Sequence, residues 1–189
     1  TISIGAGTCT STAADIVTLG ANKFTVANGT TFNITAYANQ DLSNMTNSGT
    51  GTVQINIQNS SSLTNSNLST VNTIIIPNGI TISQTADNIV TVGPIKYSVS
   101  NGGTLNITSY TNQDLAAMTN NGTIGITTDD GAVIDETKMA DATTINIATG
   151  TATGVSADMD ALASKITVAN GATFNISAYT TQSLGALTN

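Results

Sequence analysis

One stretch occurs three times in this chain and constrains its fold more than any other feature. The copies span residues 23–37, 96–110 and 165–179. In each copy, two short runs of alternating apolar and polar residues flank an Asn-Gly pair, which tolerates the positive φ of a tight turn. Two apolar residues three positions apart follow each copy and indicate a short helical segment. Each copy therefore predicts a strand, a turn, a second strand and a short helix.

A weaker form of this pattern recurs about every 24 residues along the rest of the chain. Alternating runs that begin at Thr1, Thr73 and Thr144 start three super-repeats of about 72 residues. The super-repeats cover residues 1–72, 73–143 and 144–189, and the third is truncated. Each complete super-repeat holds three coils, which gives about eight coils in total. A unit this small cannot bury its own apolar face, so it has to stack on its neighbours.

We therefore predict a mainly β fold, namely a parallel β-solenoid of about eight coils that forms one continuous stack. Its strands would form ladders with a spacing of about 4.8 Å. Phe24, Tyr97 and Ile166 would occupy equivalent core positions, three coils apart. A β-sandwich with Asn-Gly hairpins is the alternative. It explains the alternation, but it explains neither the even spacing nor the recurrent helical segments.

The alternation also predicts which side chains face the core. In the last copy, Phe174 and Ile176 should point inward, whereas Thr167 and Asn175 should point outward. The equivalent residues of the other copies extend these outward rows. The predicted outward positions are Thr25, Asn33, Ser98, Asn106, Thr167 and Asn175.

Composition narrows the classes of function. Charged residues make up 8% of the chain and aromatic residues 4%, His and Trp are absent, and Thr, Asn and Ser together supply about 40%. The net charge of −7 and the total of four Lys and Arg residues disfavour nucleic acid and anionic membrane surfaces as partners. The longest aliphatic run covers residues 74–76, too short to span a bilayer. Cys9 is the single cysteine, so no internal disulfide forms.

Residues 68–80 resemble one leucine-rich repeat of bacterial surface proteins. The resemblance rests on the apolar spacing of Leu68, Val71 and Ile74 before the turn at Asn78-Gly79. More broadly, the Thr- and Asn-rich, His-free array resembles the secreted solenoid regions of giant bacterial adhesins and S-layer proteins. This resemblance implies an extracellular, cell-surface location and a structural role.

The main acidic cluster is the candidate ion site. Asp129, Asp130 and Asp135 could bind Ca²⁺, but their spacing fits neither an EF-hand nor the nonapeptide of calcium β-rolls. The internal alignment also places the uncharged residues 58–60 at the same turn. We therefore expect no cofactor, with Ca²⁺ as the alternative. Eight Asn-x-Ser/Thr sequons are also present, and they are sites of possible glycosylation.

We expect a structural segment that extends or assembles with itself, and no enzyme activity, because His is absent and the acids recur at helix starts. The self-association hypothesis depends on the two ends of the array. Ile2 and Ile4 should form an unpaired edge at one end, and Leu184 and Leu187 at the other. The chain starts at Thr1 without a leader and neither end has a polar cap, so we expect the array to continue beyond this segment. Partners would be further repeats, other copies or a surface glycan. The alternatives are a glycan-binding adhesin module and, further away, an ice-binding or polysaccharide-acting β-helix.

Overall fold

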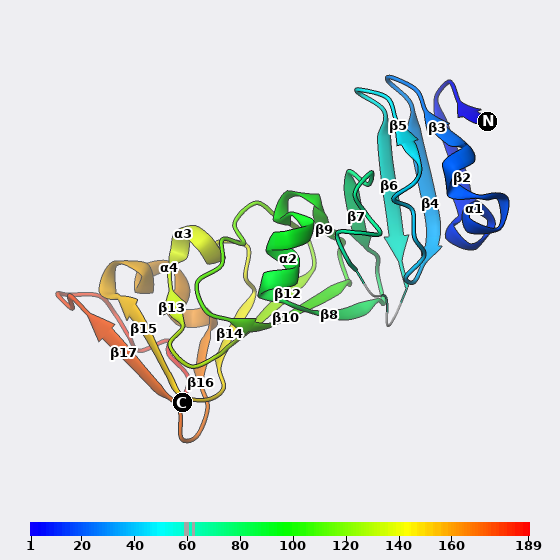
Figure 1. The fold of residues 1–189 in the computed structure, drawn as a ribbon. Helices are drawn as coiled ribbons and strands as arrows, with labels where there is room; N and C mark the ends of the chain where they lie inside the picture. Colours follow the sequence, from blue (N-terminus) through cyan, green and yellow to red (C-terminus); the bar gives the residue numbers. More distant parts are fainter. Residues whose placement is uncertain (59–60, 62) are drawn as a thin grey trace.

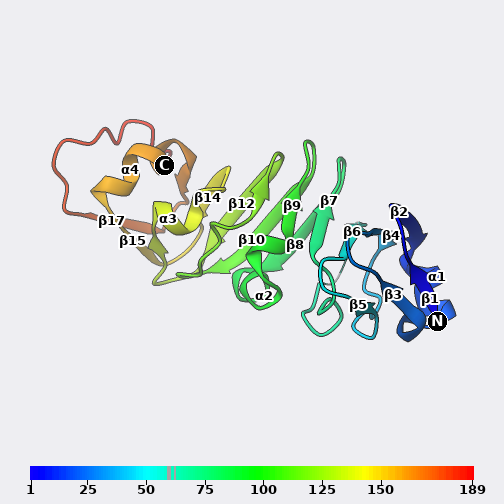
Figure 2. The same cartoon turned by 90° about the horizontal axis from the view of Figure 1, so that it is seen from above.

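The computed structural model describes residues 1–58, 61 and 63–189 of the chain. The fold is mainly β, with parallel sheets and a few short helices. The chain progresses from one end of an elongated molecule to the other, with the two termini at opposite ends (Figure 1). Seen from above, successive strands follow one another along this direction (Figure 2).

Four sheets contain all the named strands. The first holds β1 (Ile2–Ile4), β3 (Phe24–Val26) and β5 (Thr46–Asn47). The second holds β2 (Thr8–Thr12), β4 (Thr31–Tyr37), β6 (Thr52–Ile57), β7 (Thr73–Ile76), β9 (Tyr97–Val99) and β11 (Thr119–Asn120). The third holds β8 (Thr81–Thr85), β10 (Thr104–Tyr110), β12 (Thr123–Thr128), β14 (Thr144–Ile147) and β16 (Ile166–Val168). The fourth holds β13 (Val133–Ile134), β15 (Thr151–Val155) and β17 (Thr173–Ser177).

Short helices form some of the corners between these strands. The α-helices are α1 (Ala13–Leu19), α2 (Ala86–Val92), α3 (Glu136–Met139) and α4 (Met159–Leu162). The 3₁₀ segments are η1 (Ala21–Lys23), η2 (Pro94–Lys96), η3 (Ser156–Asp158) and η4 (Ala163–Lys165). Thr12 caps α1, because its hydroxyl oxygen accepts a hydrogen bond from the Asp15 amide at 3.1 Å. Thr85 caps α2 in the same way.

Each strand pairs in parallel with strands one unit earlier or later in the chain. In the second sheet, Thr8 pairs with Thr31, which in turn pairs with Thr52. Every pair of named strands within the described residues is parallel, so the Asn-Gly turns join strands that lie in different sheets. The β-sandwich with hairpins is therefore not the fold. The Asn-Gly pairs still form tight turns, since Gly29 and Gly102 have positive φ values of 70° and 77°.

The prediction of one continuous solenoid of eight coils is wrong, because the units do not stack as a single column. After β6, the next strand β7 does not join the sheet of β5; it pairs with β6, and Ile55 lies beside Ile74. The same change occurs after β12, where Ile126 pairs with Ile145 of β14. The stack thus shifts sideways by one sheet at two places, and the described residues do not show a closed solenoid.

The sideways shift coincides with a difference in strand length. The β5 and β11 strands have two residues each, whereas β6 and β12 have six. A longer strand offers more backbone partners and more apolar side chains to the strand that follows.

One side chain satisfies the backbone at each shift. Asn72 precedes β7. Its backbone amide donates a hydrogen bond to the Val53 carbonyl at 2.8 Å. Its side-chain Oδ1 accepts a hydrogen bond from the Val53 backbone amide, also at 2.8 Å. Thr143 precedes β14 and makes the same pair of contacts with Ile124, at 2.7 and 3.0 Å. An Asn in one super-repeat and a Thr in the next therefore have the same role: each pairs the backbone amide and carbonyl of a β6 or β12 residue just before the offset strand begins.

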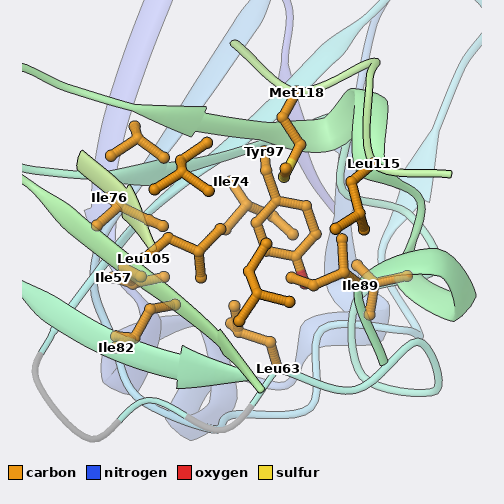
Figure 3. Packing of buried hydrophobic residues seen from close by; sticks show 14 of the residues in the cluster. Ile57, Leu63, Ile74, Ile76, Ile82, Ile89, Tyr97, Leu105, Leu115 and Met118 are labelled. Atoms are coloured by element: carbon orange, nitrogen blue, oxygen red, sulfur yellow. The ribbon is translucent and has the colours of Figure 1, made fainter. Parts of the chain in front are cut away.

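The buried apolar residues of all units form one cluster. Figure 3 shows part of this cluster around Tyr97. Phe24, Tyr97 and Ile166 are all buried, as the repeat alignment predicts. Phe32 and Ile34 of β4 are fully buried, and so are the equivalent Leu105 and Ile107 of β10. The corner residues Leu115 and Met118 are buried in the same core, close to Tyr97 (Figure 3). No helix within the described residues has the length and apolar character needed to cross a membrane.

At the end of β4 and of β10, a residue with left-handed backbone conformation turns a tyrosine into the core. Ala36 and Ser109 have φ values of 56° and 53°, and the strand pairing shifts at these points. As a result, Tyr37 and Tyr110 are fully buried, and burial raises the pKa of Tyr37 to about 12. Tyr37 has a hydrogen-bonding partner in Asn67. The Tyr110 hydroxyl has none among the described residues.

This difference gives a matched pair of variants. Tyr110→Phe removes a buried hydroxyl without a protein partner, so we expect the free energy of unfolding to stay level or rise by up to about 1 kcal/mol. Tyr37→Phe removes a satisfied hydroxyl at the equivalent position and should lower it by about 1 kcal/mol. Denaturant titration of the two variants beside the wild type measures both values. A larger loss for Tyr110→Phe than for Tyr37→Phe would contradict the assignment of partners.

Candidate functional site

The predicted ion cluster is part of the turn and cap structure. Asp130 precedes Gly131, whose φ is 78°, and its Oδ1 accepts a hydrogen bond from the Thr151 amide at 2.7 Å. Asn28 of the first super-repeat makes a similar contact, since its Oδ1 accepts a hydrogen bond from the Thr50 amide at 3.0 Å. Asp130-Gly131 is therefore a turn of the Asn-Gly kind, and its carboxylate takes the place of an Asn side chain.

Asp135 serves as the cap of α3. Its Oδ1 accepts hydrogen bonds from the amide and the hydroxyl of Thr137, at 2.8 and 2.6 Å. These hydrogen bonds hold the pKa of Asp135 below its usual range, with the hydroxyl contact as the largest cause. The structure thus separates Asp130 and Asp135 into two local roles. No group of three potential metal-ligating His, Cys, Asp or Glu residues occurs in the part of the chain that the structure describes. Of the predicted uncharged counterpart, Asn59 and Ser60 lie outside the described residues.

Metal removal should consequently leave the fold unchanged. We expect the same melting temperature with and without a chelator, because the carboxylate oxygens of Asp130 and Asp135 already accept backbone hydrogen bonds. Thermal unfolding followed by circular dichroism in EDTA provides the measurement. A lowered melting temperature that added Ca²⁺ restores would contradict this expectation and point to the segment 129–141.

A shallow hollow of about 190 Å³ lies on the outer side of the fourth sheet, between Val133, Val155 and Ser177. Asp135 and Asp158 both line it. The pKa of Asp158 is raised, mainly by desolvation and further by the negative charge of Asp135, whereas backbone hydrogen bonds from Glu136 and Val155 act in the opposite direction. Sequence reasoning placed Asp158 at a helix start and missed this neighbour. Two carboxyl groups with opposite pKa shifts are a pattern seen in acid–base pairs. Here the cap at Thr137 accounts for Asp135, and one raised carboxyl alone carries no chemistry.

The raised pKa of Asp158 predicts a pH-dependent effect of removing its charge. A folded-state pKa above the unfolded value means that the native state gains stability when this group is protonated and loses it as the pH rises through the folded pKa. Asp158→Asn should therefore raise the melting temperature at pH 7, and the gain should shrink as the pH falls below the usual carboxyl range. Asp129→Asn, at an exposed loop position, is the control for the lost charge. A gain for Asp158→Asn that is equal at pH 3 and pH 7 would refute the assignment.

The predicted outward rows lie on the faces of the sheets. Thr167 and Asn175 are exposed, and Thr25, Asn33, Ser98 and Asn106 are half-buried. In the second sheet, Asn33 lies between Thr10 and Gln54, and in the third sheet Asn106 lies between Ser83 and Gly125. Asn33 also accepts a hydrogen bond from Asn56 at 2.7 Å. These rows are mixed ladders of Thr, Asn, Gln, Ser and Gly, so equivalent Asn residues do not form one continuous array.

The N-terminal end exposes side chains that other units bury. Ile2 is half-buried and Ile4 is buried. Cys9 lies at the inward register position of β2, beside Phe32, yet it is exposed. The equivalent residues of the later units, Ile82 and Ala152, are 3% and 0% exposed. The face of the first unit is therefore an open cross-section of the core.

Lysines mark the same difference between the end and the interior. Lys96 and Lys165 each donate to a backbone carbonyl one unit earlier, that of Leu68 at 3.5 Å and that of Ala140 at 3.3 Å. Lys138 donates to the side chain of Asn112 at 2.6 Å, again one unit earlier. Lys23 occupies the equivalent corner of the first unit, and no partner for its ammonium group occurs within the described residues. A further unit at this end would supply such a carbonyl.

The C-terminal end is also open. Leu184 and Leu187 are half-buried and pack against the core, together with Phe174 and Ile176. Thr188 pairs with Thr167 and begins a new position in the third sheet. A hollow of about 420 Å³ lies here, lined by Val168, Ala172, Phe174, Ile176 and Leu187, among others. The predicted end residues Ile2, Leu184 and Leu187 are thus partly exposed apolar side chains at the two ends of the array.

Comparison of this chain with protein-family models, with curated proteins and with solved structures gives no match in any of the three cases.

Proposed function

We propose that this chain is a structural repeat segment of an extracellular surface protein, of the S-layer, filament or adhesin-stalk kind, which extends or assembles through stacked coils. In this proposal the segment is a solenoid whose stack of coils shifts sideways by one sheet after every third unit. The observation that carries the proposal is the pair of open ends on an array whose interior units are otherwise closed by their neighbours. The exposed Cys9 and the half-buried Phe174 both have buried equivalents inside the array.

The outer faces support the same role. They present hydroxyl and amide groups from strands such as β4, β10 and β12, and water can solvate these groups directly. The extracellular location is supported by the resemblance of the composition to secreted repeat regions. The alternative function, a glycan-binding module, would also use these polar faces. Exposed aromatic side chains that could stack on a sugar ring are few, however. Tyr179, which is 57% exposed, is the large aromatic side chain that the described residues leave in solvent.

Self-association at rising protein concentration tests this proposal. We expect the mass from light scattering and the longest dimension from X-ray scattering to increase together, while the cross-section stays constant, because a head-to-tail contact that does not close produces a filament. Cys9→Lys places a charge on the open core face and should suppress this growth. Thr10→Lys adds the same charge at the adjacent outward position and is the matched control.

A constant monomer mass at every concentration would overturn the proposal of assembly by this segment. Growth that Thr10→Lys suppresses and Cys9→Lys does not would show lateral contact instead of stacking. A glycan array on the same preparation distinguishes the adhesin alternative, which requires a reproducible ligand.

A further inference from the structure

Building on the stacking role proposed above, we propose that the hollow at the C-terminal end binds one particular kind of partner strand. The partner is a segment with a glycine, a threonine and two aliphatic residues in alternation, of the type found at residues 51–55 and 122–126 of this chain. It adds in parallel to β17. This assigns an interface, a register and a recognition element to the open end.

The two earlier super-repeats show what covers the equivalent surface. In the first, Phe32 and Ile34 of β4 pair with Val53 and Ile55 of β6, and all four side chains are fully buried. In the second, Leu105 and Ile107 of β10 pair with Ile124 and Ile126 of β12, and their exposed fractions do not exceed 2%.

Phe174 and Ile176 of β17 occupy the same positions in the third super-repeat, and they are only half-buried. Val168 shows the same contrast, since its equivalents Val26 and Val99 are 0% exposed. The hollow therefore lies where the first two super-repeats each place a further parallel strand, β6 and β12. Continuity with those contacts identifies the occupant as a strand of the β6 or β12 kind.

The register of the added strand follows from the same pairs. Thr31 and Thr104 each pair with the threonine that begins the next strand, and Asn33 and Asn106 with the polar or glycine residue two positions later. The threonine of the partner should accordingly lie beside Thr173, and its two aliphatic residues beside Phe174 and Ile176.

A glycine supplies the recognition element. A Cβ atom on Gly51 would lie 2.7 Å from the Ala27 carbonyl oxygen and 3.0 Å from Cγ1 of Val26. A Cβ atom on Gly122 would lie 2.8 Å from Cγ1 of Val99. The backbone at Gly51 and Gly122 thus passes directly over the valine at the end of β3 or β9. Val168 at the end of β16 is the equivalent valine at the open end. A larger residue at this position of the partner would hold the strand away from the hollow.

A synthetic peptide of residues 121–143, with a fluorescent label, tests the proposal at a fixed low concentration of the chain. We expect saturable binding by anisotropy and protection of the amides of residues 173–177 from hydrogen exchange. Gly122→Ala in the peptide should weaken binding at least about tenfold, because backbone atoms surround that position. Phe174→Ala in the chain should weaken it similarly, whereas the outward variant Asn175→Ala should leave it unchanged.

A second measurement covers the case in which the free peptide does not fold. Residues 121–143 are appended after Asn189, since Thr188 pairs with Thr167 as Thr119 pairs with Ser98. The extended chain should melt at a higher temperature and resist protease better than the original. The same extension with Asn in place of the two aliphatic residues equivalent to Ile124 and Ile126 should give no gain.

Three outcomes would overturn the proposal. The first is absence of peptide binding together with no stabilisation by the extension. The second is peptide protection at residues 2–12 without protection at 173–177, which would place the contact at the other end. The third is peptide binding that Phe174→Ala leaves unchanged, which would place the contact outside the hollow. Failure here leaves the concentration series on the unmodified chain unaffected, so the two proposals fail separately.

Discussion

Parallel pairing between units that lie about one repeat apart in the sequence is the interaction on which this structure depends. A single unit has two short strands and one corner, and it cannot satisfy its own backbone or bury its own apolar face. Thr31–Ile34 of β4 becomes an interior strand only because β2 lies on one side and β6 on the other. Stability therefore comes from contacts between units, and the same dependence leaves each end of the array incomplete.

The sideways shifts follow from a local competition within this scheme. The two-residue β5 strand ends at Asn47, whose Nδ2 donates to Oδ1 of Asn72 at 2.9 Å. That same Oδ1 accepts the Val53 amide, so one side chain joins the short strand, the long strand and the start of the next unit. Thr143 connects Asn120 and Ile124 in the second super-repeat. The shift is thus built by hydrogen bonds that satisfy the backbone, and it costs no buried orphan groups at Val53 or Ile124.

The sequence could predict the unit and its inward face but not the path of the stack. Alternation and Asn-Gly turns correctly indicated parallel, stacked units and the burial of Phe24, Tyr97 and Ile166. They could not show that β7 would pair with β6 and not with β5, because that choice depends on contacts between units that no local pattern reveals. The turn role of Asp130 was accessible from the sequence, since Asp-Gly is a turn signal like Asn-Gly. The proximity of Asp158 to Asp135 was not, because residues 23 positions apart meet only through the stacking.

Parallel stacking in register also explains the unusual composition. Equivalent side chains lie directly above one another, as in the row Thr8, Thr31 and Thr52 and the row Thr81, Thr104 and Thr123. Like charges in such a row would repel at about 4.8 Å, whereas hydroxyl and amide groups tolerate or bond their own kind.

Correspondingly, none of the named strands in the described residues contains Asp, Glu, Lys or Arg. The charged residues lie at turns and corners, where Asp41 caps its neighbour Ser43 and Lys96 reaches a carbonyl of the previous unit. A chain built by repeated addition of similar strands is thereby restricted to neutral polar side chains on its faces. The same restriction makes its open ends chemically compatible with further strands of its own kind.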